Sequence, residues 1–476
     1  MRSLSPRGTG QARRRLGAIL LLAGLVVLFV AGITTALVLM NKAGTESTPE
    51  KNLSAVPTPG DSPRSEGHGA TPDPDNVAEP VPEKPSPLDE RVATAQPAVS
   101  KGVAFLKAKM AALRQQNLYN SGYAIFTSQS MLPGVAGLIG LTLLECGVPP
   151  DDPAIAQVAE ILHAEAPRME KNYVLSAALF FLNRWDESLP QGLAENDHKL
   201  ARTFALRIIA GQWSSGVWDY NAVLLTPKQE ADLLASLQQG AYKPNVKNRP
   251  YYSISNTQFV MLALWGARRH GVPVRDVLLA TAEHFNVNQA ADGHWIYSTV
   301  EPRYLWTTST CAGLIALAIE KALREDSEFV TKVLEVDTAK KRADANRAFA
   351  YVARSIGRRK GDPGIRSQYT GTLFQADAWG DLYFLWCVER VGMIYGKDRI
   401  GDKDWYDWGC PLVLKAQRDD GSWRDRHDPL VDSCFALLFL KRANIAKDLT
   451  IMLSKPLMEN GPKAPPGNAP PHGRQP

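Results

Sequence analysis

The sequence lacks most of the short motifs that reveal a reaction. It contains no His-Glu-x-x-His, no Walker A loop and no Rossmann glycine pattern, which argues against the common metalloprotease and nucleotide-binding sites. Its 54 Lys and Arg nearly balance 49 Asp and Glu. No basic stripe interleaved with aromatics appears, so a nucleic-acid partner is not expected.

Neither cysteine nor histidine is spaced as in a metal site. No Cys-x-x-Cys occurs, and a lone thiol in an apolar helical run packs as a small hydrophobe. A disulfide stays open, because the sequence cannot name a pair. The five cysteines are Cys146, Cys311, Cys387, Cys410 and Cys434. The histidines of the body lie far apart, and solvated or helix-end roles are expected for His163, His198, His270, His284, His294 and His427. We predict no metal and no cofactor.

The chain begins with a basic stretch, residues 1–15, followed by an uncharged apolar run over residues 16–40. At about 25 residues this run exceeds the roughly 20 that cross a bilayer. The arginines precede it and only Lys42 follows, so the N-terminus is expected in the cytoplasm. We predict a single-pass anchor in a bacterial inner membrane, with the rest of the chain on the periplasmic side. The alternative is a long cleaved signal peptide, because small residues occur near Thr35 and Ala36.

Two polar, Pro-rich stretches flank the body of the chain. Residues 41–97 have no apolar period, which predicts a disordered linker. Residues 456–476 form a second such stretch and are expected to be a disordered tail. The segment 98–455 between them is large for one compact domain unless it folds as a repeat or a barrel.

Two kinds of helix alternate along this body. The first kind is amphipathic and is predicted over Val99–Leu113, Ile155–Ala164, His198–Ala210, Val274–Phe285, Ala343–Ile356 and Trp405–Ala416. The second kind is apolar on nearly every side and must be surrounded by protein. It is predicted over Pro133–Cys146, Tyr173–Phe181, Ser255–Ala267, Thr308–Ile319, Asp381–Tyr395 and Asp432–Leu440. Alternation of the two kinds indicates two concentric rings, so the predicted fold is all-α, an α/α toroid of about six helical hairpins.

The pattern Gln-x3-Gly-x-Trp occurs three times, which marks an internal repeat. Its members are Gln212, Gly216 and Trp218; Gln289, Gly293 and Trp295; and Gln417, Gly421 and Trp423. Glycine is expected to form a positive-φ turn after each amphipathic helix, glutamine to bond unpaired backbone groups, and tryptophan to cover the joint between repeats. We predict a structural role for this element and no ligand contact.

The spacing Phe285-x3-Gln289-x3-Gly293-x-Trp295 resembles the repeat of squalene and oxidosqualene cyclases, whose α/α barrels are shared with protein prenyltransferase β subunits. Three further segments are similar to a bacterial, membrane-anchored and largely uncharacterised subgroup with the prenyltransferase/squalene-oxidase repeat. They are Asn256-Thr257-Gln258-Phe259, Asp404-Trp405-Tyr406 and Asp432-Ser433-Cys434-Phe435-Ala436-Leu437-Leu438. The resemblance covers about Val99 to Leu453 and implies the toroid; it implies little about chemistry, because one fold hosts many reactions.

The chemistry of these families is not evident in the sequence. The cyclases protonate an alkene with an Asp-x-Asp-Asp cluster, which this chain lacks. Asp432 and Asp381 are the candidates for a catalytic acid, and Asp377 is a further carboxylate; all three suit helix caps or turns. The prenyltransferases hold zinc with Asp, Cys and His. Asp432 and Cys434 resemble the first two ligands, but the only later histidine is His472, so a cap and a buried thiol are predicted instead.

Cations with aromatic neighbours precede three of the enclosed helices. They are Arg249 with Tyr251 and Tyr252, Arg303 with Tyr304 and Trp306, and Arg366 with Tyr369. In a toroid the enclosed helices run parallel, so their positive N-terminal ends gather at one mouth. There these residues, together with Asn256, would suit an anionic head group on an apolar tail, or a sugar. Arg303→Ala with Arg366→Ala should then abolish lipid or glycan retention. The alternative is local loop packing.

Two functions from different classes stay open. In the first, the chain is a membrane-anchored binding or scaffold module for an isoprenoid-like or other amphipathic ligand, or for a partner protein of the envelope. In the second, it is a divergent terpenoid-type cyclase or transferase, or a glycan-active α/α-barrel hydrolase or lyase. Because no acid motif is present, binding is favoured. The charged pair Glu389-Arg390 inside an apolar helix is predicted to be a structural ion pair.

Overall fold

A computed structural model describes residues 87–115, 131–244, 246–247, 252–297, 306–325, 343–359 and 380–454. The chain divides into two compact units, Met1–Pro82 and Glu83–Pro476, and all described residues belong to the second. They are predominantly helical. The only strands within these ranges are β1 (Arg399–Ile400) and β2 (Lys403–Asp404), which pair antiparallel. The all-α prediction is confirmed.

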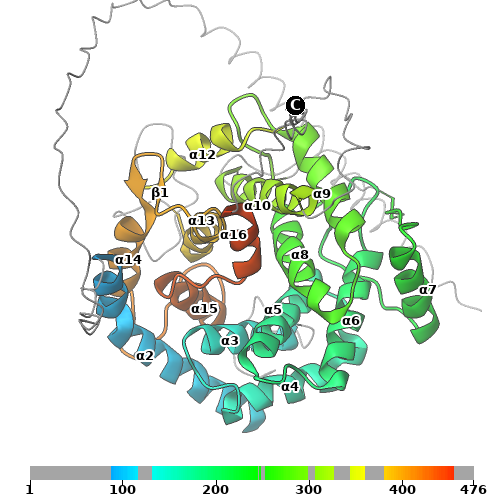
Figure 1. The fold of residues 1–476 in the computed structure, drawn as a ribbon. Helices are drawn as coiled ribbons and strands as arrows, with labels where there is room; N and C mark the ends of the chain where they lie inside the picture. The colour runs from blue at the N-terminus through cyan, green and yellow to red at the C-terminus, as the bar shows by residue number, and fades with distance from the viewer. Residues whose placement is uncertain are drawn as a thin grey trace, which may run out of the picture. The chain divides into compact units, whose positions relative to one another are not determined.

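The predicted enclosed helices all form. They are α3 (Leu132–Glu145), α5 (Asn172–Ser188), α8 (Ile254–Ala267), α10 (Trp306–Glu325), α13 (Leu382–Ile394) and α15 (Pro429–Leu440). Every residue of α8 is buried, as its apolar sequence requires. In the order given, each helix contacts the next, and α15 contacts α3. The six inner helices therefore make a closed cycle of contacts within the second unit (Figure 1).

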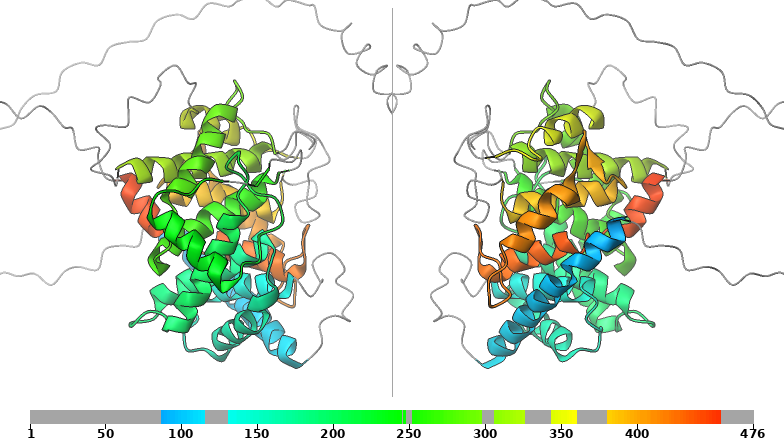
Figure 2. Two further views of the ribbon diagram at one scale, coloured as in Figure 1. Left: turned by 90° about the vertical axis from the view of Figure 1, so that its right-hand side faces the viewer. Right: turned by 90° about the vertical axis from the view of Figure 1, so that its left-hand side faces the viewer.

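The predicted amphipathic helices also form, and in Figure 1 they lie outside this cycle. They are α2 (Pro87–Gln115), α4 (Pro153–Glu165), α6 (Glu195–Ala210), α9 (Arg275–Asn288), α12 (Ala345–Ala353) and α14 (Trp405–Lys415). Each packs on inner helices: α4 on α3, α6 on α5 and α8, α9 and α12 on α10, and α14 on α13 and α15. The first of them, α2, packs against α15, α14 and α3, and Figure 2 shows it running beside α14 and α15.

The start of α2 corrects one predicted boundary. The linker was expected to reach residue 97, but the helix begins at Pro87 and continues through Pro97. Ala95 and Val99, one turn apart, are both buried, so tertiary packing overrides the Pro-rich composition. The predicted basic tail, membrane span, most of the linker and the tail 456–476 lie outside the described residues. Among the residues that are described, no helix is long and apolar enough to cross a membrane.

Four short helical elements were not expected. They are α7 (Pro227–Gln238), α16 (Lys447–Ser454) and the 3-10 turns η3 (Ala166–Arg168) and η4 (Arg268–His270). Helix α7 begins at a capping box in which Thr226 and Gln229 bond reciprocally. It buries only Leu237 and packs on α6, which explains why no apolar stripe revealed it. Helix α16 packs against α10 and α13.

The glutamine and glycine of the repeat join consecutive outer helices in the same way each time. Gln212 Nε2 donates to the carbonyl of Gly216 in its own turn (3.0 Å) and to that of Val277 in α9 (2.9 Å). The glycines have φ of +86°, +97° and +85°, confirming the predicted turn. A Cβ on Gly216 would lie 2.2 Å from the Ala280 carbonyl oxygen of α9. Only glycine permits both the dihedral and this close approach.

Each repeat tryptophan hydrogen-bonds the C-terminal end of the helix that precedes it. The Nε1 atoms of Trp218, Trp295 and Trp423 donate to the carbonyls of Ile208, Phe285 and Val413, at 2.8, 2.8 and 2.7 Å. These carbonyls belong to the last turns of α6, α9 and α14, where intrahelical donors run out. Each tryptophan backbone N–H also donates to a hydroxyl of the following inner helix, from Thr257, Thr310 or Ser433. The element therefore fastens an outer helix to the next inner one, as its predicted structural role requires.

Candidate functional site

Several inner helices begin at the same end of the cycle. Tyr173, the second residue of α5, donates its hydroxyl hydrogen to Ser255, the second residue of α8. Tyr383, the second residue of α13, donates to Gln258 Oε1 of α8 (3.2 Å). These contacts place the N-terminal ends of α5, α8 and α13 together, which is the arrangement expected for a common mouth.

A layer of hydroxyl groups lies at this end. Tyr297 Oη lies 2.9 Å from Ser253 Oγ and 2.6 Å from Ser255 Oγ. Burial raises the pKa of Tyr297 to about 12, although hydrogen bonds from the two serines oppose the shift. Burial also raises the pKa of Tyr173. These phenols stay protonated near neutral pH, so the layer offers neutral hydrogen-bond donors and acceptors.

Asn256 lies at the edge of this layer and is fully buried. Its Nδ2 donates to Ser253 Oγ (2.9 Å), whereas nothing in the described part of the chain donates to its Oδ1. Tyr252, which was predicted at the mouth with Asn256, packs edge-on against His284, with ring centroids 5.4 Å apart. Trp306 begins α10. The other predicted mouth residues, Arg249, Tyr251, Arg303, Tyr304, Arg366 and Tyr369, lie outside the described residues.

Beneath the hydroxyls the interior of the cycle is aromatic. Phe259 of α8 contacts Trp386 of α13 across the cycle, with ring centroids 5.0 Å apart. Phe180 of α5 and Phe435 of α15 extend the cluster, at 5.6 Å from Phe259 and 5.3 Å from Trp386 respectively. Tyr173 joins the two layers, because its ring meets Phe259 edge-on at 5.1 Å. Trp386 Nε1 is buried and has no acceptor among the described residues, which is costly for an indole N–H.

Both candidate carboxylates have backbone partners. Asp381 is the N-cap of α13, and its Oδ1 accepts from the Phe384 N–H (2.7 Å). Asp432 was expected to cap α15, but that cap is Asp428. Instead Asp432 accepts from the backbone N–H groups of Asp425 (2.6 Å) and His427. These carboxylates organise helix starts, as acids committed to backbone donors do.

Asp425 ties the two helix starts together. Its Oδ2 accepts from the Leu382 N–H at the start of α13 (2.9 Å), while its own N–H donates to Asp432 of α15. The loop before α15 is therefore fixed by both helices. Asp432 also lies 3.2 Å from His427 Nδ1, a contact that the sequence did not indicate.

The cysteines are all free. Burial raises the pKa of the Cys434 thiol, so it is a poor zinc ligand beside Asp432. Burial likewise raises the pKa of Cys387 to about 12. Within the described ranges, the only group of three or more His, Cys, Asp or Glu side chains close enough to hold a metal is Asp186, His198 and His270. The prediction that the histidines lie far apart is therefore wrong for His198 and His270.

The charged pair predicted within α13 is buried. Arg390 bonds the carboxylate of Glu389 and the carbonyl of Ala443, and neither charged side chain is more than 1% exposed. Burial raises the pKa of Glu389 to about 7 despite the adjacent guanidinium. The pair is internal to α13 and joins it to the segment before α16, which agrees with the predicted structural role.

No protein-family model matches this sequence, and no curated protein matches it. The resemblance of the repeat to cyclases and prenyltransferases stays a prediction. The assignment of function therefore depends on the geometry of the site.

Proposed function

We propose that the chain is a membrane-anchored α/α toroid that binds an amphipathic, isoprenoid-like ligand without transforming it. The closed cycle of inner helices, with outer helices packed on it, supports the toroid. The apolar run over residues 16–40 supports the anchor. A protease that cleaves the folded domain in spheroplasts but not in intact cells would agree with the periplasmic placement.

One observation carries the proposal: a hydroxyl layer lies directly on an aromatic interior. The apolar tail of a ligand would pack against the aromatic cluster of Phe259, Trp386 and Phe435, whose rings suit a branched hydrocarbon chain. Its polar head would bond the hydroxyls of Tyr297 and Ser255. Asn256 Oδ1 supplies an acceptor that nothing else in the described chain uses.

The hydrogen bonds of the two candidate carboxylates favour binding over catalysis. A cyclase or glycosidase needs an acid with a base, or two carboxylates, directed at one reacting centre. Asp381 and Asp432 both accept backbone hydrogen bonds. Four other titratable groups near the aromatic interior, Tyr173, Tyr297, Tyr383 and Cys387, have pKa values raised by burial, so none of the four is a proton donor or base matched to neutral pH. The ring of His427 lies 5.8 Å from that of Phe435, and its Nδ1 is paired with the Asp432 carboxylate.

Lipid analysis tests the proposal. The full chain, extracted from membranes in mild detergent, should carry a polyisoprenoid lipid that mass spectrometry identifies. With a polyprenyl phosphate as probe, Tyr297→Phe should weaken binding about tenfold, because one head-group hydrogen bond is lost.

Tyr242→Phe is the matched control. Its hydroxyl bonds Ile209 O and Gln212 Oε1, both at 3.0 Å, away from the aromatic interior. This variant should lose similar stability and keep full binding. Equal binding by the wild type and Tyr297→Phe, or turnover of the probe to a new product, would reject the proposal.

A further inference from the structure

Three potential ligands meet where α5 ends. Asp186 lies in the last turn of α5, His198 in the first turn of α6, and His270 ends η4. His198 lies between the other two. Its Nδ1 is 2.8 Å from His270 Nδ1, and its Nε2 is 3.8 Å from Asp186 Oδ1. One potential ligand atom from each residue lies within 4.8 Å of the others. Ligand atoms around tetrahedral zinc are separated by about 3.3 Å, so small side-chain rotations suffice.

The hydrogen bonds fix the tautomer of His270. Its Nε2 lies 2.8 Å from Asn183 Oδ1, which has no hydrogen to donate, so the N–H is on Nε2. The Nδ1 lone pair therefore points to His198. An imidazole whose second nitrogen donates to a fixed oxygen is the usual arrangement of a metal-bound histidine.

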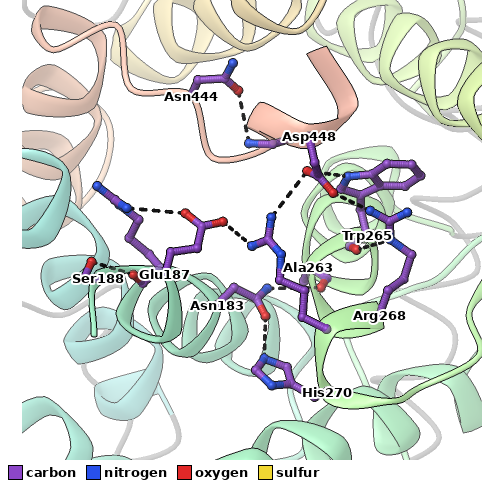
Figure 3. Close-up of polar contacts among 12 residues, drawn as sticks. Asn183, Glu187, Ser188, Ala263, Trp265, Arg268, His270, Asn444 and Asp448 are labelled. Carbon is purple, nitrogen blue, oxygen red and sulfur yellow. Dashed lines mark hydrogen bonds and ion pairs between the residues drawn. The ribbon is translucent and has the colours of Figure 1, made fainter. Parts of the chain in front are cut away.

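Asn183 is held in turn by the packing of α8 on α5. Figure 3 shows Asn183 between His270 and the carbonyl of Ala263, to which its Nδ2 donates at 3.5 Å. A Cβ on Gly266 would lie 2.0 Å from Asn183 Nδ2. A glycine at position 266 therefore makes room for the side chain that orients His270.

The surrounding charges do not exclude a cation. Arg269 and Arg202 lie near His270, and both have acidic partners. Arg269 bonds Glu187 and Asp448, the network drawn in Figure 3. Arg202 pairs with Glu195. A carboxylate, Asp186, completes the donor set, and its Oδ1 is fixed by the Leu193 N–H (2.8 Å).

We propose that Asp186, His198 and His270 bind Zn²⁺, with a fourth position occupied by solvent. Two imidazoles and a carboxylate form a borderline donor set that zinc favours. Three protein ligands leave one tetrahedral position, and the side chains of His198 and Asp186 are 24% and 15% exposed, which admits water. The site lies near the C-terminal end of α5, about 20 Å along the helix from Tyr173. It is therefore independent of the ligand site proposed above.

The test uses the untagged full chain after chelation and dialysis, with Zn²⁺ alone as the probe. We expect one zinc per chain by elemental analysis, and a rise in Tm of roughly 5 °C at a hundredfold excess over Kd. Replacement with Co²⁺ should give the strong visible bands of tetrahedral ligation. His198→Gln should lower zinc affinity at least a hundredfold, and Asn183→Ala, which disturbs only the orientation of His270, by 10–100-fold.

His163→Gln is the matched control. His163 Nε2 pairs with Asp197 Oδ1 at 2.6 Å, a histidine–carboxylate contact outside the group of three. This variant should bind zinc like the wild type. The metal-free Tm of every variant shows whether it folds. Absence of a zinc-dependent rise in Tm and of cobalt bands in the wild type, or equal zinc binding by His198→Gln and His163→Gln, would overturn the proposal.

Discussion

The side-chain amide of Gln417 donates to the backbone carbonyl of Ala98, 319 residues earlier (2.8 Å). The other two repeat glutamines make the same contact with the outer helix that follows them, at Val277 and at Asp344. The glutamine of the last repeat therefore bonds α2 in the way that the other two bond the outer helix that follows them. The joint between the two ends of the proposed toroid uses the same bond as the joints within it.

Gln417→Ala tests whether this joint contributes to stability. Removing the amide takes the side-chain donor from the carbonyl of Gly421 and from that of Ala98, which keeps its bond within α2; the loss should cost about 2 kcal/mol. Gln289→Ala, at an internal joint, should cost a similar amount. Urea unfolding measures both, and exposed Gln239→Ala should stay within about 0.5 kcal/mol of the wild type. A neutral Gln417→Ala beside a destabilising Gln289→Ala would mean that the ring is open at this joint.

The repeat glycine permits a second comparison, between two positions of nearly equal φ. Gly421 has φ +85° and Gly147 has φ +87°. A Cβ on Gly421 would lie 2.5 Å from Lys101 O, whereas nothing lies within 4 Å of one on Gly147. Gly147→Ala should cost about 1 kcal/mol for the dihedral alone. Gly421→Ala should cost about 3 kcal/mol or more, because α2 must also move away. Equal losses would show that α2 does not pack there.

Asp432→Asn separates a structural role from a catalytic one. Asparagine has one side-chain oxygen where aspartate has two, so its NH2 group would face the backbone N–H of either Asp425 or His427. We expect this to cost about 2 kcal/mol of stability. Asp419→Asn, in an exposed turn, should be neutral. An Asp432→Asn protein with unchanged stability but lost activity on any isoprenoid substrate would instead identify Asp432 as a catalytic acid.

Glu389 makes stability depend on pH. Burial raises its folded pKa from 4.5 to about 7. Between these values the folded chain holds a proton that the unfolded chain has released, so this group's contribution to stability falls as pH rises. Glu389→Gln should therefore gain up to about 3 kcal/mol relative to the wild type between pH ~5 and pH ~8. Denaturant unfolding at both pH values measures this. A relative loss at high pH would show that attraction to Arg390 exceeds the desolvation of the carboxylate.

The sequence predicted the twelve principal helices because each carries either one apolar stripe or apolar residues all round. It missed α7, whose single buried residue is Leu237, and the first turns of α2, where Pro97 suggested a linker. Both errors have one cause: packing partners distant in the sequence stabilise segments whose local pattern is weak.

The residues of the two proposed sites were harder to predict than the repeat turns. The turn geometry of Gly216, Gly293 and Gly421 followed from residue type alone. The contact between Phe259 and Trp386 could not be predicted, because it crosses the interior between helices that are not neighbours in the cycle. His198 and His270 are 72 residues apart, and no spacing motif connects them. Only the return of α8 alongside α5 brings them together.

The contact between α2 and the last repeat also has a consequence for biosynthesis. Helix α2 leaves the ribosome first, and its partners α14 and α15 follow some 300 residues later, roughly 15–60 s at ordinary translation rates. During that interval the apolar surfaces of the early helices lack the late helices that cover them in the folded domain. Nascent chains of this protein should therefore depend on holdase chaperones until the final hairpin emerges, and stalled products that end before Trp405 should aggregate.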